Sequence, residues 1–293
     1  MHIDLIAVPY DSSHRGSRMG AGPEHLLRAG LPDRLAEVGH QVHVRVLEAP
    51  ADTWRAEIRT AFDLARGVAS AVRDARASGA FPLVLSGNCG PAALGCVAGL
   101  GASPSILWFD AHGDFNTPET TVGGFLDGMA LATVTGRCWT QLSVGIPDFR
   151  PVPDSSVALL GVRDLDPLEA AALDGSDVQQ VPPANLRAAL PSVLTSVGRG
   201  TTATYLHLDL DVLDPGEGRV NPYAAPDGLT RADLAWAIGA IAASLPLSAA
   251  SLTAFDPDSD TTGQAAKAAL ELGLGLVHAA DPARRAEVAR RIR

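Results

Sequence analysis

Lysine is almost absent from this sequence, and positive charge is outweighed by negative charge. The chain has 23 basic residues, of which Lys267 is the single lysine, against 33 acidic ones, for a formal net charge of −10. Binding to nucleic acid generally requires a basic face. The composition therefore predicts that nucleic acid is not a partner.

Cysteine is also scarce, and the sequence shows neither long apolar runs nor a leader-like N-terminus. The three cysteines, Cys89, Cys96 and Cys138, are odd in number and show no CxxC spacing, which is typical of a reducing compartment without disulfides. No stretch reaches about 18 uninterrupted apolar residues, so no membrane span is expected. The first residues lack the charged and apolar regions of a signal peptide. We therefore expect a cytoplasmic protein.

What is present is a regular alternation of apolar segments. Of the 293 residues, 46 % are hydrophobic, and short β-branched runs alternate with longer Ala- and Leu-rich stretches. This pattern predicts an α/β fold with a parallel sheet covered by helices. The predicted strands are 3–9, 42–48, 81–87, 105–111, 157–162, 203–210 and 249–256. The predicted helices are 54–78, 91–99, 127–136, 184–197, 231–244 and 262–280.

Two Pro- and Gly-rich segments, 145–156 and 213–228, interrupt this alternation. Neither resembles a flexible linker, because strands and helices resume directly after each. Residues 1–293 are therefore expected to form a single domain.

Ligand-type side chains follow one predicted strand. Asp110, His112 and Asp114 alternate where strand 105–111 opens into a loop, and in an extended segment alternate side chains share a face. A single aspartate here would usually be a turn or cap residue. Two carboxylates and an imidazole on one face, however, are costly to bury unless a cation binds them.

A second cluster follows strand 203–210, where Asp209 and Asp211 alternate in the same way. The carboxyl ends of parallel strands form the usual ligand crevice of such sheets. Oxygen-rich ligands with one imidazole suit Mn²⁺ best, with Zn²⁺ or Co²⁺ as alternatives. Shared carboxylates favour two ions about 3.5–4 Å apart, a spacing suited to activating one bridging water.

The segments that carry these ligands resemble those of a known family. "DAHGDFNTPETT" and "LHLDLDVLDP" are similar to the two metal-binding signatures of the ureohydrolases, which include arginases and agmatinases, and "VPYDSSHRGSRMGAGP", "GGFLDGM" and "GVRDLDP" extend the match. The resemblance implies a three-layer α/β/α fold with a mainly parallel sheet. It also implies two Mn²⁺ ions that hydrolyse a guanidino or related C–N bond, and a cationic amino-acid-like substrate.

The resemblance further implies roles for individual residues. Asp110 and Asp209 would bridge the two ions. His112 and Asp211 would complete one metal site, and Asp114 would serve the other and hydrogen-bond the nucleophile. At the amino-acid end of the substrate, the matching positions are Asn116, Thr121 and Asp166. Asp166 is equally well explained as a helix cap.

Cys89 is the main departure from the family pattern, because it stands where the family has a metal-binding histidine. Three interpretations stay open. Cys89 ligates as a thiolate, which would favour Zn²⁺ or iron over Mn²⁺; it is a weak or absent ligand; or it is a nucleophile. A cysteine in this place is similar to a branch of the family that hydrolyses N-hydroxyarginine.

Two further departures concern catalysis and recognition. Asp127 replaces a histidine that relays protons in arginases, and it could instead carry the proton or cap the following helix. Ala254 replaces a glutamate that binds guanidinium, and loss of such a carboxylate weakens recognition of a planar cation. Asp256, two residues later, is a candidate to compensate, and it could also simply cap a turn.

We therefore predict a metal-dependent hydrolase that acts on a linear amidine in a guanidino or N-hydroxyguanidino amino-acid derivative and releases urea or hydroxyurea. Asp114 or Asp127 would pass a proton to the leaving amine. The alternative is a catalytically degenerate family member that binds a ligand or a partner. Family members often form trimers or hexamers, so a homo-oligomer is an open expectation.

Overall fold

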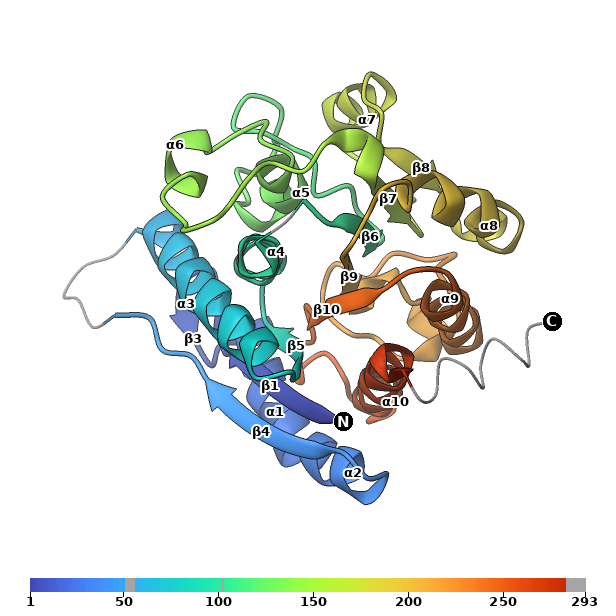
Figure 1. The fold of residues 1–293 in the computed structure, drawn as a ribbon. Coiled ribbons are helices and arrows are strands. Elements are labelled where there is room, and N and C mark those ends of the chain that lie inside the picture. Colours follow the sequence, from blue (N-terminus) through green and yellow to red (C-terminus); the bar gives the residue numbers. More distant parts are fainter. Residues whose placement is uncertain (51–55, 102, 283–293) are drawn as a thin grey trace.

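A computed structural model describes residues 1–50, 56–101 and 103–282, and eight of its strands form one sheet (Figure 1). Their order is β4-β1-β5-β10-β9-β6-β7-β8, and every neighbouring pair is parallel. The strands are β1 (His2–Val8), β4 (Gln41–Val46), β5 (Phe81–Ser86), β6 (Ser105–Phe109), β7 (Val157–Leu160), β8 (Gln179–Val181), β9 (Thr204–Asp209) and β10 (Leu247–Thr253).

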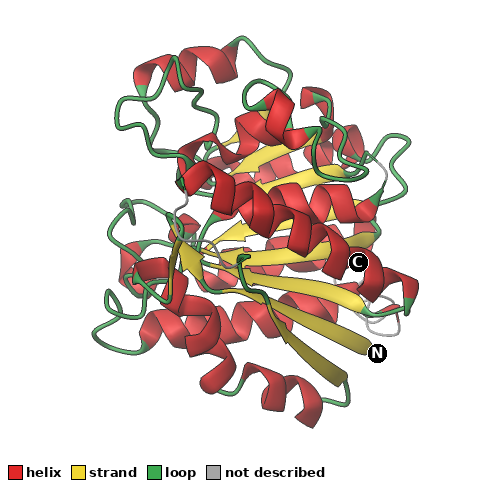
Figure 2. Cartoon of the chain, turned by 90° about the vertical axis from the view of Figure 1, so that its left-hand side faces the viewer, coloured by secondary structure: helices red, strands yellow, loops and turns green. Residues whose placement is uncertain are grey.

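Helices cover both faces of this sheet (Figure 2). One core includes α3 (Glu57–Ala77), α4 (Cys89–Leu100) and α5 (Ala130–Val134). The opposite core includes α1 (Gly22–Arg28), α2 (Leu31–Glu37), α8 (Leu186–Val197), α9 (Arg231–Ser244) and α10 (Gln264–Ala280). The predicted three-layer arrangement is confirmed.

The central strands are apolar because both of their faces are covered. Every residue of β5 is buried, and successive side chains alternate between the two cores: Leu83 and Leu85 belong to one, Val84 to the other. Strand β6 is buried in the same way, with Phe109 on one face and Trp108 on the other.

The elements that the sequence did not predict are short. Strand β8 has three residues, and helices α1 and α2 have seven each, which is too few for a clear hydrophobic period. The helix predicted over 127–136 begins instead as a 3₁₀ turn, Asp127–Met129, followed by α5. The first residues of the helix predicted over 54–78 lie outside the described part, and α3 is described from Glu57.

The sheet order places four chain segments side by side. Strands β5, β10, β9 and β6 are neighbours in the middle of the sheet, and Thr253 at the end of β10 pairs with both Ser86 and Asp209. Residues that follow these strands therefore meet at one edge.

Within the described residues, no helix combines the length and apolar character needed to cross a bilayer.

Candidate metal centre and active site

A cavity of about 270 Å³ lies at this edge of the sheet. The predicted site residues that line it are Cys89, Asp110, His112, Asp114, Asn116, Thr121, Asp127, Asp166, Asp209 and Asp211. Asp256 does not line it. Segments far apart in the chain thus converge, as shown by the contact between Cys89 and Asp209, which are 120 residues apart.

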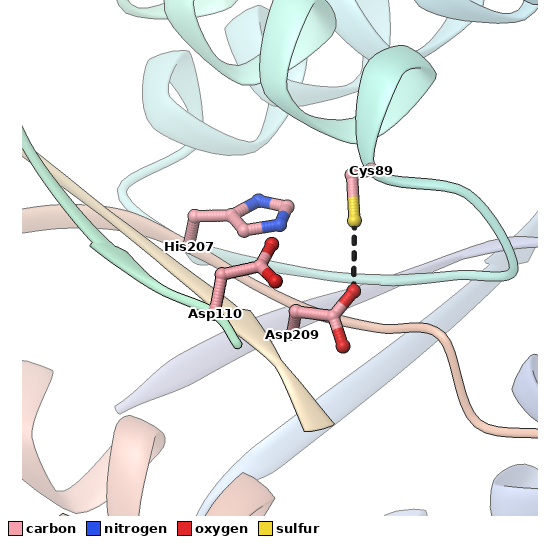
Figure 3. A group of neighbouring side chains, drawn as sticks. All are labelled: Cys89, Asp110, His207 and Asp209. Carbon is pink, nitrogen blue, oxygen red and sulfur yellow. Dashed lines mark hydrogen bonds between the residues drawn. The ribbon is translucent and has the colours of Figure 1, made fainter. Parts of the chain in front are cut away.

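The first group of ligand-type side chains is Cys89, Asp110, His207 and Asp209 (Figure 3). All four are buried, and one ligand atom from each lies within 4.8 Å of the others. The Cys89 Sγ donates to Asp209 Oδ2 at 3.0 Å. Burial, reinforced by Asp209, raises the pKa of this thiol well above its usual range. Cys89 therefore carries a proton that a bound cation would displace.

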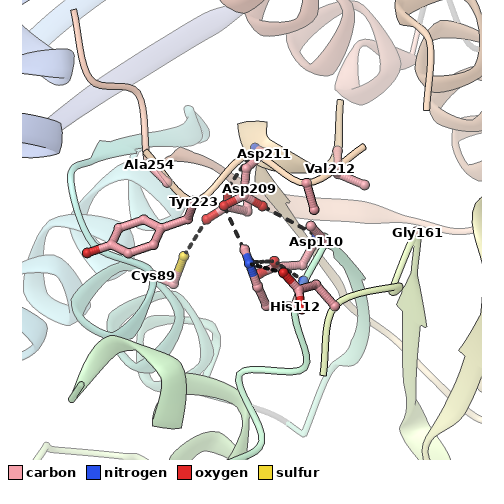
Figure 4. A network of polar contacts seen from close by, with 12 residues as sticks. Cys89, Asp110, His112, Gly161, Asp209, Asp211, Val212, Tyr223 and Ala254 are labelled. Carbon is pink, nitrogen blue, oxygen red and sulfur yellow. Dashed lines mark hydrogen bonds and ion pairs between the residues drawn. The ribbon is translucent and has the colours of Figure 1, made fainter. Parts of the chain in front are cut away.

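The second group is Asp110, His112 and Asp211 (Figure 4). The His112 Nδ1 lies 3.3 Å from Asp110 Oδ1 and 3.4 Å from Asp211 Oδ2. Asp110 belongs to both groups, as a bridging carboxylate must. Asp209 belongs to the first group and accepts a hydrogen bond from the Asp211 backbone at 2.8 Å.

Asp114 lies in the cavity but in neither group. Its backbone adopts a left-handed conformation, with φ of 49°, which non-glycine residues rarely adopt. Its buried Oδ2 has no hydrogen-bond partner. A buried carboxylate oxygen without a partner is costly, so this atom is a further indication that the cavity binds a charged or hydrogen-bonding ligand.

The clustered charges shift the pKa values of these groups. Burial, and then the nearby carboxylates, raises the pKa values of Asp110, Asp114 and Asp209. Burial opposes the charged form of His112 as well, but its contacts with Asp110 and Asp211 raise the pKa of His112 to about 12. The same contact with His112 outweighs burial and lowers the pKa of Asp211 to about 2.

These residues fit a pair of divalent cations. The two groups together with Asp114 offer four carboxylates, two imidazoles and a thiol, and the carboxylates repel one another when charged. A bound cation becomes the largest local charge and reverses that repulsion. The partnerless oxygen of Asp114 is in the same cavity. The donor set and its unfavourable charge balance together fit a two-cation centre.

Asp127 organises the turn that carries Cys89. Its Oδ2 accepts hydrogen bonds from the Cys89 backbone (2.9 Å) and the Asn88 amide (3.0 Å), and its Oδ1 from the Gly90 backbone (2.8 Å). The carboxylate thus satisfies the start of α4 rather than capping the helix that follows it. Burial outweighs these donors and raises the pKa of Asp127 to about 7.

Glu169 supports the loop that carries Asp114, and the sequence analysis missed it. Its Oε1 accepts a hydrogen bond from the Phe115 backbone at 2.8 Å, and its Oε2 from the Asp166 backbone at 3.3 Å. Gly113 leaves room for this carboxylate, because a Cβ at this position would come within 2.6 Å of Glu169 Oε1. Glu169 stands three residues after Asp166, at the start of a helix. This spacing is a capping signal that could have indicated Glu169 from the sequence.

Arg163 holds the loop that carries Asp211 in place. Its guanidinium donates to six backbone carbonyls, at distances of 2.8–3.3 Å, namely those of Gly161, Asp211, Val212, Leu213, Ala225 and Pro226. Gly161, with φ of 96°, packs closely against Val212 (Figure 4). This arrangement ties the Asp211 loop to the segment 225–226.

The mouth of the cavity contains the residues predicted to bind the amino-acid end of a substrate. Asn116 Nδ2 donates to Asp166 Oδ2 at 3.1 Å, and Thr121 lies on the same wall. Asp166 is also the N-cap residue of α7 (Pro167–Asp174). Both interpretations of Asp166 thus agree with its position.

Ala254 also lines the cavity, and its backbone adopts a left-handed conformation, with φ of 63°. Asp256 is directed elsewhere: it accepts hydrogen bonds from the Asp258 backbone (3.1 Å) and the Ser259 hydroxyl (3.3 Å). The expectation that Asp256 compensates at the site is therefore not supported, because its carboxylate stabilises its own turn. Tyr223, stacked on Phe125, lines the cavity as well.

His207 was also missed. It lies on β9 two residues before Asp209, so the same alternation that indicated Asp209 and Asp211 places His207 on their face. The alternation in "HLDLD" could have predicted that His207 shares this face. The sequence alone could not predict that Cys89 and Asp110 lie beside it.

Comparisons with known proteins agree with this geometry. The model of the Arginase family matches residues 1–278. The N(omega)-hydroxy-L-arginine amidinohydrolase of Streptomyces lavendulae is 30 % identical over 234 residues, which cover 79 % of this chain and 81 % of the relative. The crystal structure of arginase from Bacillus cereus has a TM-score of 0.84 at 25 % identity and covers 94 % of this chain and 98 % of that one.

A more distant structure is the Entamoeba histolytica arginase in complex with L-ornithine, with a TM-score of 0.82 at 19 % identity, covering 94 % of this chain and 97 % of that one. The fold is that of the arginase-fold proteins, a class of hydrolases. The chain belongs to the arginase family. Its members are hydrolases acting on guanidino C–N bonds and normally hold a binuclear metal site, which confirms the predicted family and class of enzyme.

Proposed function

We propose that the protein hydrolyses the C–N bond of an N-hydroxyguanidino amino acid, of the N-hydroxyarginine type, and releases hydroxyurea. The observation that carries this proposal is the composition of one cavity. It contains both ligand groups, a polar wall suited to an amino-acid end group, and an alanine, Ala254, where arginases have a guanidinium-binding glutamate. The relative from Streptomyces lavendulae, named for N-hydroxyarginine, supports the same substrate class.

Two divalent ions would be held by the two ligand groups. Ions in such a centre supply Lewis acidity and lower the pKa of water toward neutrality. The oxygen-rich group of Asp110, His112 and Asp211 suits Mn²⁺. A guanidinium carbon is a poor electrophile because of resonance, so this assistance is needed for hydrolysis at neutral pH.

The chain's own residues bind the substrate and move the proton. Asn116, Thr121 and Asp166 orient the amino-acid end at the mouth. The free Oδ2 of Asp114 is placed to receive a proton during attack and to donate it to the leaving nitrogen. Asp127, with a pKa of about 7, is suited to the same task, although its oxygens already hold the start of α4.

The test uses the full chain loaded with divalent metal and a panel of arginine, N-hydroxyarginine, agmatine and formimino amino acids. We expect the highest kcat/KM for N-hydroxyarginine, with release of hydroxyurea, and no turnover after chelation. Asn116→Ala should raise KM more than it lowers kcat. A fully metal-loaded protein without turnover on any of these compounds would refute the proposal and favour the degenerate binding protein. Activity that survives chelation would revive Cys89 as a nucleophile.

We further infer a reducing compartment such as the cytoplasm, since Cys89, Cys96 and Cys138 are all buried and unpaired.

A further inference from the structure

We propose that His207 is a fourth protein ligand of the ion held by Cys89, so that the two positions of the centre differ in the metal they select. This inference rests on the proposed two-metal hydrolase. It assigns to the Cys89 position a thiolate, an imidazole and two carboxylates. The Asp110–His112–Asp211 position remains rich in oxygen.

The geometry supports a shared ion. His207 lies within 4.8 Å of the ligand atoms of Cys89, Asp110 and Asp209. It is completely buried, whereas the other three line the cavity. His207 is therefore the member of the group that lies behind the cavity lining, and its ring lies beside the Asp110 carboxylate (Figure 3).

The contacts of His207 hold its ring for coordination through Nε2. Two hydroxyls contact Nδ1, those of Tyr205 (2.8 Å) and Ser251 (3.0 Å). A proton on Nδ1 can be donated to either of them, which leaves the lone pair on Nε2. Such outer partners commonly fix the tautomer and orientation of a metal-binding histidine. The Trp108 ring, stacked at 3.7 Å, fixes the plane of the imidazole.

Nε2 is the nitrogen on the Cys89 side. It lies 3.3 Å from the Thr253 hydroxyl, which is itself 3.3 Å from Cys89 Sγ. A second and independent sign of a ligand in this cavity is Asp114, whose buried Oδ2 has no partner. A histidine that only fills the core would account for the hydroxyl contacts, but not for its position among three other ligand-type groups.

The donor set predicts the metal. Thiolate, imidazole and carboxylate ligands in a four-coordinate arrangement are typical of Zn²⁺, whereas Mn²⁺ prefers oxygen. We therefore expect Zn²⁺ at the Cys89 position and Mn²⁺ at the His112 position when both metals are offered.

The test compares the wild type with His207→Gln after chelation and reconstitution in a mixture of Zn²⁺ and Mn²⁺. Loss of outer partners typically weakens metal affinity about 10–100-fold, so loss of a direct ligand should weaken Zn²⁺ binding by about 100-fold or more while Mn²⁺ content is retained. With Co²⁺ as the probe, His207→Gln should keep the thiolate-to-metal absorption but lose the strong visible bands of a four-coordinate ion.

The matched control is His40→Gln, which changes another buried histidine, just before β4 and outside the cavity. It should leave Zn²⁺ affinity and the Co²⁺ spectrum unchanged. Zinc X-ray absorption with Zn²⁺ supplied at one equivalent gives a further test. Sulfur together with an imidazole at the same Zn²⁺ supports the proposal when the His112→Ala variant gives the same spectrum as the wild type, because the imidazole then does not come from His112.

Unchanged Zn²⁺ affinity in His207→Gln, or a zinc spectrum with sulfur and no imidazole, would overturn the proposal. None of these measurements uses a substrate. Their failure would leave the proposed hydrolysis intact, and a protein with both metals bound as expected but without turnover would contradict the proposed function alone.

Discussion

At the scale of single residues, Ala254 is the position where the resemblance to arginases predicts that the cavity lacks a carboxylate. Its methyl group lies on the cavity wall, and its carbonyl accepts a hydrogen bond from the buried Asn221 amide at 3.0 Å. The left-handed backbone at φ of 63° is kept although it disfavours any residue with a Cβ. The backbone at this point is therefore fixed by its surroundings, and a longer side chain would enter the cavity from the same direction.

We expect Ala254→Glu to shift the preference of the enzyme from N-hydroxyarginine toward arginine. A carboxylate on this wall can accept hydrogen bonds from a guanidinium, and hydrogen bonds to charged groups contribute about 1.5–3 kcal/mol, or roughly 10- to 100-fold in the ratio of kcat/KM values. The measurement is kcat/KM for both substrates. The matched control, Ala254→Gln, adds the same bulk without charge. An equal shift in both variants would contradict the charge argument.

At the scale of elements, the loop that carries Asp211 depends on polar side chains from other segments. Arg163 binds six carbonyls, five of which belong to the segments around Asp211 and Ala225. Asn221, fully buried, donates to Asp211 Oδ2 at 3.2 Å as well as to Ala254. The position of Asp211 is thus set by contacts that lie outside its own strand.

We expect Arg163→Lys to destabilise the fold and to weaken metal binding together. A lysine has one compact ammonium in place of a planar fork, so several of the six carbonyls would lose their partner, at about 1–3 kcal/mol for each that stays buried. The free energy of unfolding should fall by roughly 2 kcal/mol or more. Denaturant unfolding and metal titration measure the two effects.

The matched control is Arg187→Lys on α8, where an exposed guanidinium pairs with Asp233 at 2.9 Å. Such surface pairs contribute little, so the change should stay below about 1 kcal/mol. If Arg163→Lys were as mild as this control, the role assigned to Arg163 would be wrong.

The difference between local patterns and contacts between distant segments explains which features could be predicted from the sequence. The sheet and the ligands Asp110, His112, Asp209 and Asp211 follow local rules: buried strands are apolar, and alternate residues at a strand end share a face. Arg163, Glu169 and the hydrogen bonds of Asp127 follow from contacts between segments far apart in the chain. His207 required both, since its face was predictable and its proximity to Cys89 was not.

At the scale of the whole molecule, the clustered carboxylates and His112 at the cavity make the stability of the fold depend on pH and on metal binding. Asp110, Asp114 and Asp209 have pKa values above the ordinary value of 3.8 in the metal-free fold. The folded state therefore binds more protons than the unfolded state above pH 3.8, so their contribution to stability is lost as the pH rises. His112 acts in the same direction, because its pKa of about 12 exceeds the ordinary 6.5, and its contribution is lost between those values.

Asp211 changes the stability with pH in the opposite direction, but it does so only at acidic pH. Its pKa of about 2 is below 3.8, so its contribution is fully present above pH 3.8 and is lost only as the pH falls toward 2. Between pH 5 and 9, the groups with raised pKa values determine how this cluster changes the stability of the fold with pH. Stability of the chelated protein should therefore decline across this interval as far as this cluster determines it.

Metal binding reverses that dependence, because ligands must lose their protons to coordinate and the cation then stabilises their charged forms. We expect the increase in unfolding temperature on adding Zn²⁺ and Mn²⁺ to grow from pH 5 to pH 8. Thermal unfolding of chelated and metal-loaded protein across this range measures it. Asp209→Asn removes one titrating ligand, so its metal-induced increase should be smaller and should rise less steeply with pH. An increase that is equally large at every pH would show that metal uptake displaces no protons, which is incompatible with the raised pKa values of the Cys89 thiol and of the carboxyl groups described above.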